Sequence, residues 1–165
     1  MKVNFIINYI FLCFIFLLYN KVQGYRKCFT NWAGINVYLN FTCGNHNPEV
    51  YQITIFECET GFTYNCYKQC KLTPNDKEVS SYHAERSIQV SPLLGFDVVF
   101  EIYHKCCNKP DVSEPPCQNP FNFKMSDDCM SCGPGPYCVY HVDLKDGKVY
   151  SKEGKLLYLA VPKNW

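Results

Sequence analysis

The stretch Val37-Tyr38-Leu39-Asn40-Phe41-Thr42-Cys43 decides the fold class, because apolar and polar residues alternate along it. A strand turns successive side chains to opposite faces, so this period of two is what a half-buried strand requires. Asn40-Phe41-Thr42 is also an N-glycosylation sequon, and Asn40 falls on the polar face. We therefore predict a strand that carries a glycan on Asn40.

The same period recurs at Val50 to Cys58, where we expect Tyr51, Ile53 and Ile55 on one face. Phe96 to Cys106 repeats it at greater length, and sets one group of residues against another: Val98, Phe100, Ile102 and His104 against Asp97, Val99, Glu101 and Tyr103.

Three shorter strands are predicted near the end of the chain, with Asp146-Gly147 and Glu153-Gly154 as the hairpin turns between them. They are Tyr137 to Val142, Lys148 to Tyr150 and Leu156 to Val161. Helical spacing is much weaker, since Val79 to Ile88 could form one short helix while Ser87 to Val90 also fits a strand. About six or seven strands separated by turns predict an all-β antiparallel sandwich.

The N-terminus has the three parts of a secretory signal peptide. Lys2 is followed by the apolar run Phe5 to Tyr19, and Val22-Gln23-Gly24 offers small residues at −3 and −1. We expect cleavage after Gly24, which leaves one domain at residues 25–165 and no later segment that spans a membrane. Loss of Lys2 and Lys21 changes the net charge from +1 to −1, and no basic cluster points to nucleic acid.

Cysteine is abundant, and in an exported chain it indicates disulfides. Cys13 belongs to the predicted signal, so 11 of the 12 cysteines remain. An odd number leaves one thiol that is free or links two chains as a disulfide-bonded dimer. Adjacent Cys106 and Cys107 are expected to pair with different partners. The disulfide candidates are Cys28, Cys43, Cys58, Cys66, Cys70, Cys106, Cys107, Cys117, Cys129, Cys132 and Cys138.

Residues 107–138 form a Cys/Pro-rich insert with four prolines between Pro110 and Pro120, a stretch that cannot join a central strand. Cys129, Cys132 and Cys138 are expected to staple it as a surface loop, and Gly133-Pro134-Gly135-Pro136 is expected to form a turn. Cys129-Met130-Ser131-Cys132 has the spacing of half a zinc site or of a redox pair, but disulfide ends are favoured in an oxidising compartment.

No catalytic constellation is evident. The histidines, His46, His83, His104 and His141, lie in separate segments, and none has the spacing of a metalloprotease. His104 is expected to be a packed structural residue. A phospholipase A2 site is rejected because His104 precedes Cys106-Cys107 and its segment is a strand, and no Gly-x-Ser-x-Gly turn indicates a serine hydrolase. We expect no cofactor and no metal.

Three segments resemble a known family. Val37 to Cys43 is followed by a turn from Gly44 to Pro48 and by the strand Gln52 to Glu57. Phe100-Glu-Ile-Tyr-His104-Lys-Cys106 ends a strand with histidine and then cysteine, and Gly154 to Leu159 is a short closing strand. This arrangement resembles the transthyretin-like proteins that nematodes secrete. The match covers residues 33–60 and 96–108, and the tail loosely.

The chain also departs from that family, because Gly61 to Ser91 lacks its acidic turn and the insert is extra. The resemblance implies an immunoglobulin-like β-sandwich of the transthyretin type. Related hydroxyisourate hydrolases end in Tyr-Arg-Gly-Ser, whereas this chain ends Pro162-Lys-Asn-Trp165. The resemblance therefore implies binding rather than catalysis.

The first functional hypothesis is a secreted, non-enzymatic extracellular binding protein that recognises a protein or lipid ligand. The second is a secreted effector or toxin-like protein that acts on a host target through the loop from Cys107 to Cys138, since a braced loop loses little entropy on binding. The third is an enzyme in which the fold brings His104 or His141 beside an acid or thiol.

Overall fold

The computed structural model describes residues 28–60, 64–72, 80–91, 95–106 and 120–159. The predicted signal peptide, Cys107, Cys117 and three prolines of the predicted insert, Pro110, Pro115 and Pro116, lie outside these ranges. The strands, in chain order, are β1 (Trp32–Thr42), β2 (Val50–Thr60), β3 (Tyr64–Leu72), β4 (Ser81–Gln89), β5 (Gly95–His104), β6 (Phe121–Lys124), β7 (Met130–Ser131), β8 (Tyr137–Asp143), β9 (Lys148–Ser151) and β10 (Leu156–Leu159), and a turn of 3-10 helix, η1, spans Asp127–Cys129.

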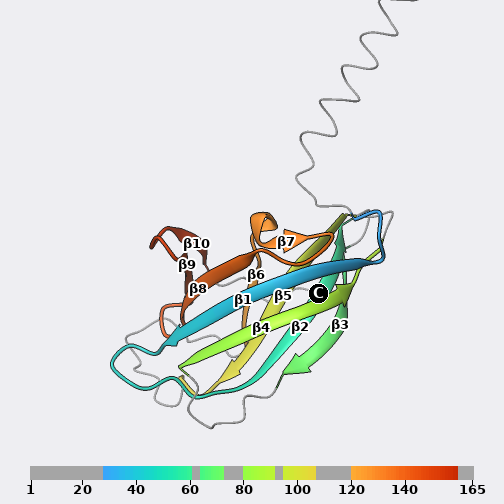
Figure 1. Cartoon of the computed structure of the whole chain (residues 1–165). Helices are drawn as coiled ribbons and strands as arrows, with labels where there is room; N and C mark the ends of the chain where they lie inside the picture. The colour runs from blue at the N-terminus through green and yellow to red at the C-terminus, as the bar shows by residue number, and fades with distance from the viewer. Residues whose placement is uncertain (1–27, 61–63, 73–79, 92–94, 107–119, 160–165) are drawn as a thin grey trace, which may run out of the picture.

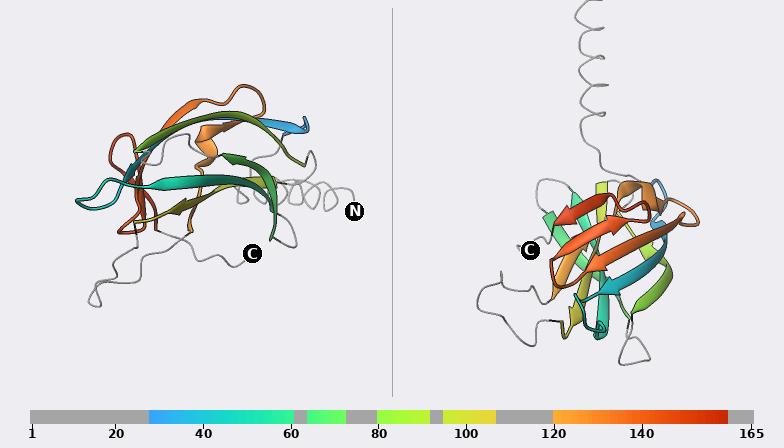
Figure 2. Two further views of the ribbon diagram at one scale, coloured as in Figure 1. Left: turned by 90° about the horizontal axis from the view of Figure 1, so that it is seen from below. Right: turned by 90° about the vertical axis from the view of Figure 1, so that its left-hand side faces the viewer.

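Two sheets pack face to face, as the strand order in Figure 1 and the two views of Figure 2 show. The four-stranded sheet has the order β3-β2-β5-β6 and is antiparallel throughout. The six-stranded sheet has the order β10-β9-β8-β1-β4, and β7 also pairs with β1. Only its β1–β8 pair is parallel. The predicted all-β sandwich is confirmed, and the parallel pair is a feature that the sequence pattern did not indicate.

Strand β1 confirms the pattern on which the prediction depends. Val37, Leu39 and Phe41 are buried, and the residues between them, Tyr38 and Asn40, are partly exposed. Their inward side chains meet those of the four-stranded sheet, where Phe123 stacks on Phe100 with ring centroids 5.2 Å apart. Phe123 also contacts Tyr140 of the opposite sheet edge-on at 5.5 Å. Aromatic contacts of this kind join the two layers of the core.

Strand β2 differs from the prediction at one end. A register irregularity lies between Val50 and Gln52, so Val50 is buried while Tyr51 is 42% exposed. An extra residue of this kind shifts the alternation by one position. The prediction that Tyr51 shares the face of Ile53 and Ile55 is therefore wrong.

Two other segments also differ from the prediction. The described part of Val79 to Ile88 is the extended strand β4, which pairs with β1 from Ser81 to Gln89, so the helical alternative is wrong. Part of the predicted surface loop is core, because β6 pairs with β5 and its Phe121 and Phe123 are fully buried. The apolar residues that follow the prolines provide a strand that completes the four-stranded sheet.

Four disulfides lie within the described part of the chain, and two of them connect segments that are distant in the sequence. Cys43–Cys106 joins the end of β1 to the residues after β5 and thereby ties the two sheets together. Cys58–Cys66 joins directly paired residues of β2 and β3. The other two are Cys28–Cys132 and Cys129–Cys138, and Cys70 is the free thiol among the described cysteines.

The turn at Gly133-Pro134-Gly135-Pro136 packs directly on β1. A Cβ added to Gly34 would lie 2.1 Å from the carbonyl oxygen of Gly133 and 2.6 Å from the amide nitrogen of Gly135. Only a residue without a side chain permits so close a backbone approach. The turn connects β7 and β8, which pair with the same edge of β1, β7 antiparallel and β8 parallel.

Candidate functional site

The Cys129 to Cys132 pair is not a dithiol. Cys129 bonds to Cys138, and Cys132 bonds to Cys28, so each sulfur is the end of a separate disulfide. Within the described ranges, no group of histidine, cysteine and acidic residues could hold a metal ion. The same residues include no helix long and apolar enough to cross a membrane.

The structure does not gather the four histidines. The backbone of His46 forms an isolated β-bridge with Cys43 in the loop after β1. His104 is fully buried at the end of β5, where its Nδ1 accepts a hydrogen bond from the Cys106 backbone N–H at 3.2 Å. His83 and His141 share the outer face of the six-stranded sheet but lie on β4 and β8, on opposite sides of β1. His104 is therefore packed, as expected for a structural residue.

Two buried acidic residues on the outer face of the four-stranded sheet have polar partners. The Tyr103 hydroxyl donates to Glu101 Oε1 at 2.7 Å, and this hydrogen bond raises the pKa of Tyr103 to about 12. Lys124 Nζ lies 2.7 Å from Asp97 Oδ1. Each of the two acids therefore has a polar partner on the same sheet, and the two contacts have a structural role.

Glu57 is the exception among the buried acids. It is 3% exposed, and its Oε1 accepts no hydrogen bond within the described residues. Burial, and then the negative charge of Glu59, raise its pKa to about 7. Its cross-strand partners are Val98 and Tyr67, and the other acid near it is Glu59, two residues along the same strand. We therefore treat the burial of Glu57 as a cost to the stability of the fold and not as part of a functional site.

An open hollow of about 320 Å³ lies beside the first half of β8. Its lining includes Asp128, Lys152 and Lys155, and the Cys129–Cys138 disulfide also borders it. None of the four histidines lines it, so it does not combine with any of them into an acid–base set.

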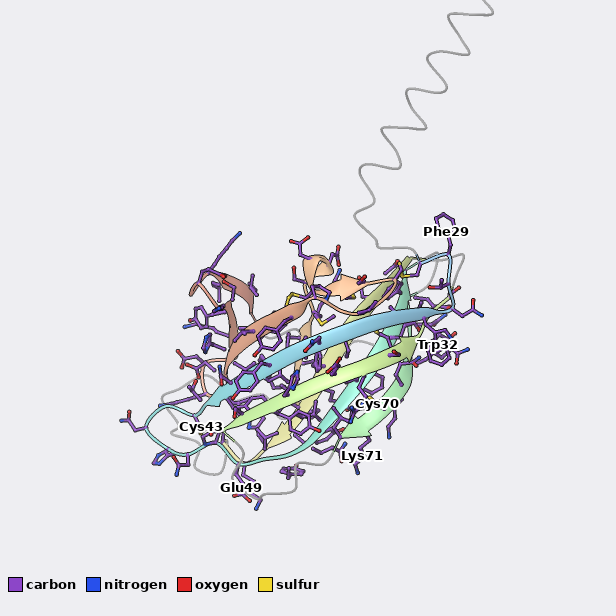
Figure 3. All side chains as sticks on the ribbon, in the orientation of Figure 1. Phe29, Trp32, Cys43, Glu49, Cys70 and Lys71 are labelled. Carbon is purple, nitrogen blue, oxygen red and sulfur yellow. A yellow bond between two sulfur atoms is a disulfide. The ribbon has the colours of Figure 1, made fainter. Side chains whose placement is uncertain are left out.

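Two exposed apolar side chains, one of them the most exposed of the large hydrophobic residues described, lie at the end of the sandwich where β1 begins (Figure 3). Phe29 is 96% exposed and Trp32 is 55% exposed, and we call this pair the Phe29–Trp32 tip. The Cys28–Cys132 disulfide fixes the segment on one side. On the other, the Asn31 carbonyl accepts a hydrogen bond from the Val90 N–H at 3.0 Å. The tip is thus held on rigid structure although it faces solvent.

A second group of partly or fully exposed rings lies on the outer face of the six-stranded sheet. His83 lies between Tyr38 and Tyr137, with ring centroids 6.4 and 6.0 Å away. The His83 Nε2 and Asn36 Oδ1 are 2.7 Å apart. We call Asn36, Tyr38, His83 and Tyr137 the tyrosine–histidine cluster. Asn40 lies on the same strand face and is partly exposed.

Sequence reasoning identified neither group. Phe29 and Trp32 precede the alternating stretch and have no periodic pattern of their own, and a ring's exposure depends on which strands become neighbours. The sequence pattern predicts only that Tyr38 and Asn40 lie next to each other on one face of the strand, because residues two apart share a face. Comparisons with family models, with curated proteins and with solved structures find no match.

Proposed function

We propose that the protein is exported and acts outside the cell as a non-enzymatic binding protein that holds a protein partner through the Phe29–Trp32 tip. The observation that carries this proposal is the exposure of two large apolar side chains, 96% and 55%, on a disulfide-anchored segment. The four disulfides suit an oxidising compartment, which supports the export part of the proposal.

The described surroundings of the tip favour a protein partner over a lipid surface. Among the described residues, Thr30, Asn31 and Gln89 are exposed beside Phe29 and Trp32 and are uncharged, whereas Arg26 and Lys27, which immediately precede Cys28 in the sequence, lie outside the described residues. Binding to an anionic membrane would draw on lysine or arginine near the apolar residues. Apolar anchors within a polar rim are typical of protein interfaces.

The tip offers enough apolar surface to matter. Complete burial of an aromatic side chain such as Phe29 contributes about 2 to 3 kcal/mol, and burial of the exposed half of Trp32 contributes about half as much. Because the segment is already anchored, little of this gain is lost in ordering it. We expect Phe29→Ser to weaken binding by about 30-fold or more.

The test measures binding of the labelled, secreted protein to intact cells. The double variant Phe29→Ser/Trp32→Ser should lose saturable binding, while the control Tyr67→Ser, which alters a side chain that is 50% exposed on β3, should keep it. Protease treatment of the cells should also abolish binding. Retained binding in the double variant, or binding to protein-free vesicles of phosphatidylcholine and phosphatidylserine, contradicts the proposal.

The resemblance to the nematode transthyretin-like proteins stays a prediction and is compatible with this proposal, since it implies binding rather than catalysis. The effector hypothesis depends on residues 107–138. The described half of that segment includes the buried strand β6, so an effector surface would have to lie elsewhere in the segment.

A further inference from the structure

Tyr38, Asn40 and Thr42 form one row along the outer face of β1. All three alternate with the buried residues Leu39 and Phe41, and none of them is buried. Residues two apart on a strand are about 7 Å from each other. The first sugar attached to Asn40 therefore starts no farther from the Tyr38 side chain than about the length of one sugar ring.

The surroundings of Asn40 leave room for that sugar. Its partners on the neighbouring strands are Ser81 of β4, which is small, and His141 of β8, which is exposed. On the Tyr38 side, Asn40 is next to the tyrosine–histidine cluster, in which His83 lies between two tyrosine rings.

From this arrangement we propose that the N-linked glycan of Asn40 lies on the tyrosine–histidine cluster, with its first sugar ring packed against Tyr38. The inference rests on the export proposed above, which glycosylation requires, and it does not depend on the Phe29–Trp32 tip. The cluster is then a saccharide-packing surface that is occupied by the protein's own modification.

The chemistry of the two partners is complementary. One face of a pyranose ring carries C–H groups with partial positive charge, and the face of a tyrosine ring is partially negative. The His83 ring and the Asn36 amide, which are 2.7 Å apart at Nε2 and Oδ1, add polar groups that can pair with sugar hydroxyls. The sugar is neutral, so Glu85, the cross-strand partner of Asn36, does not repel it.

Attachment at Asn40 also favours the contact entropically. A tethered sugar meets the cluster as an intramolecular partner at high effective concentration, so a weak contact becomes populated. Exposed apolar ring surface is covered in the process, which reduces its availability to other molecules.

The test is a thermodynamic cycle on the secreted glycoprotein. An endoglycosidase trims the glycan to one N-acetylglucosamine, and Asn40→Gln provides the sugar-free form. Parent and Tyr38→Ser proteins are unfolded by urea in both forms. We expect the sugar to raise the folded-to-unfolded ratio of the parent by about two- to tenfold, the range of aromatic contacts, and to have no effect in Tyr38→Ser.

The matched control is Tyr51→Ser, which removes an exposed tyrosine from the other sheet and should keep the full effect of the sugar. If Asn40→Gln is not secreted, amidase-treated glycoprotein replaces it. Nuclear Overhauser effects between sugar protons and the Tyr38 ring provide a second readout that general stabilisation by a glycan would not produce.

The unfavourable outcomes are distinguishable. A secreted protein whose mass does not change with amidase has no glycan on Asn40, which overturns this inference while export stands. A glycoprotein whose sugar stabilises parent and Tyr38→Ser equally, without Overhauser contacts, shows that the glycan does not lie on the cluster. If Tyr38→Ser loses cell binding, and the sugar stabilises parent and Tyr38→Ser by the same amount, the cluster binds a protein partner and not the glycan.

Discussion

Replacement of Glu57 by glutamine should stabilise the protein at alkaline pH. The carboxyl group is 3% exposed, shares its face of the sheet with fully buried Val98, and has an Oε1 without a hydrogen bond in the described part of the chain. Burial of an ionised carboxylate is costly, which is why the pKa of Glu57 is raised from 4.5 to about 7. Glutamine keeps the shape of the side chain and removes the charge.

The magnitude follows from that pKa. One pKa unit corresponds to about 1.36 kcal/mol, so the rise from 4.5 to about 7 corresponds to a cost of about 3 kcal/mol. Below pH 4.5 the group is protonated in both folded and unfolded states, and the cost is absent. Between pH 4.5 and about 7 only the unfolded state ionises freely, so stability falls as pH rises. Above about pH 7 the whole cost is present.

The assay is urea unfolding of parent and Glu57→Gln proteins at pH 4, 5.5, 7 and 8.5 without reductant. We expect nearly equal free energies of unfolding at pH 4 and a gain of about 3 kcal/mol for Glu57→Gln at pH 8.5. The control is Glu59→Gln, a partly exposed neighbour whose removal should have a small effect. Equal stabilities of parent and Glu57→Gln at pH 8.5 would refute the reasoning.

Three further predictions concern a thiol, two glycines and a hydroxyl. Burial raises the pKa of the Cys70 thiol, so we expect slow alkylation in the folded state and no intermolecular bond through it; a dimer on non-reducing electrophoresis that Cys70→Ser removes would contradict this. Gly34→Ala should lower the free energy of unfolding by about 2 kcal/mol or more, because the added Cβ meets the backbone of the turn. Gly154→Ala, at a φ of +78° in open space, should lower it by about 1 kcal/mol. Equal shifts of the melting temperature in the two variants would contradict the packing of the turn on β1. Tyr103 should resist ionisation until about pH 12, and Glu101→Gln should lower that pKa in an ultraviolet titration; an unchanged titration would show that Glu101 is not its partner.

The strands with strict alternation could be predicted from sequence, because one face meets the core and the other meets solvent. The run from Val37 to Cys43 is the clearest example, and Gly147 and Gly154 both adopt positive φ at the turns that were expected there. Tyr51 was misplaced because a register irregularity of one residue reverses the faces of a strand without any change in composition.

Elements whose environment is tertiary could not be predicted in the same way. Four-residue β6 is too short to show a period, and its burial comes from pairing with the distant strand β5. Strand β3 lies at an edge of the four-stranded sheet, and β4 lies at an edge of the six-stranded sheet. Both carry many exposed polar side chains, so neither shows a clear alternation of apolar and polar residues. The Phe29–Trp32 tip and the tyrosine–histidine cluster depend on which side chains the fold leaves uncovered.

A disulfide map of the secreted protein, obtained by mass spectrometry of unreduced peptides, tests the central claim most directly. An exported, disulfide-braced sandwich predicts Tyr25 as the first residue and a free thiol at Cys70. It also predicts the pairs Cys28–Cys132, Cys43–Cys106, Cys58–Cys66 and Cys129–Cys138. Free thiols at these positions would contradict both the fold and the proposed export, and a bond between Cys129 and Cys132 would contradict the fold.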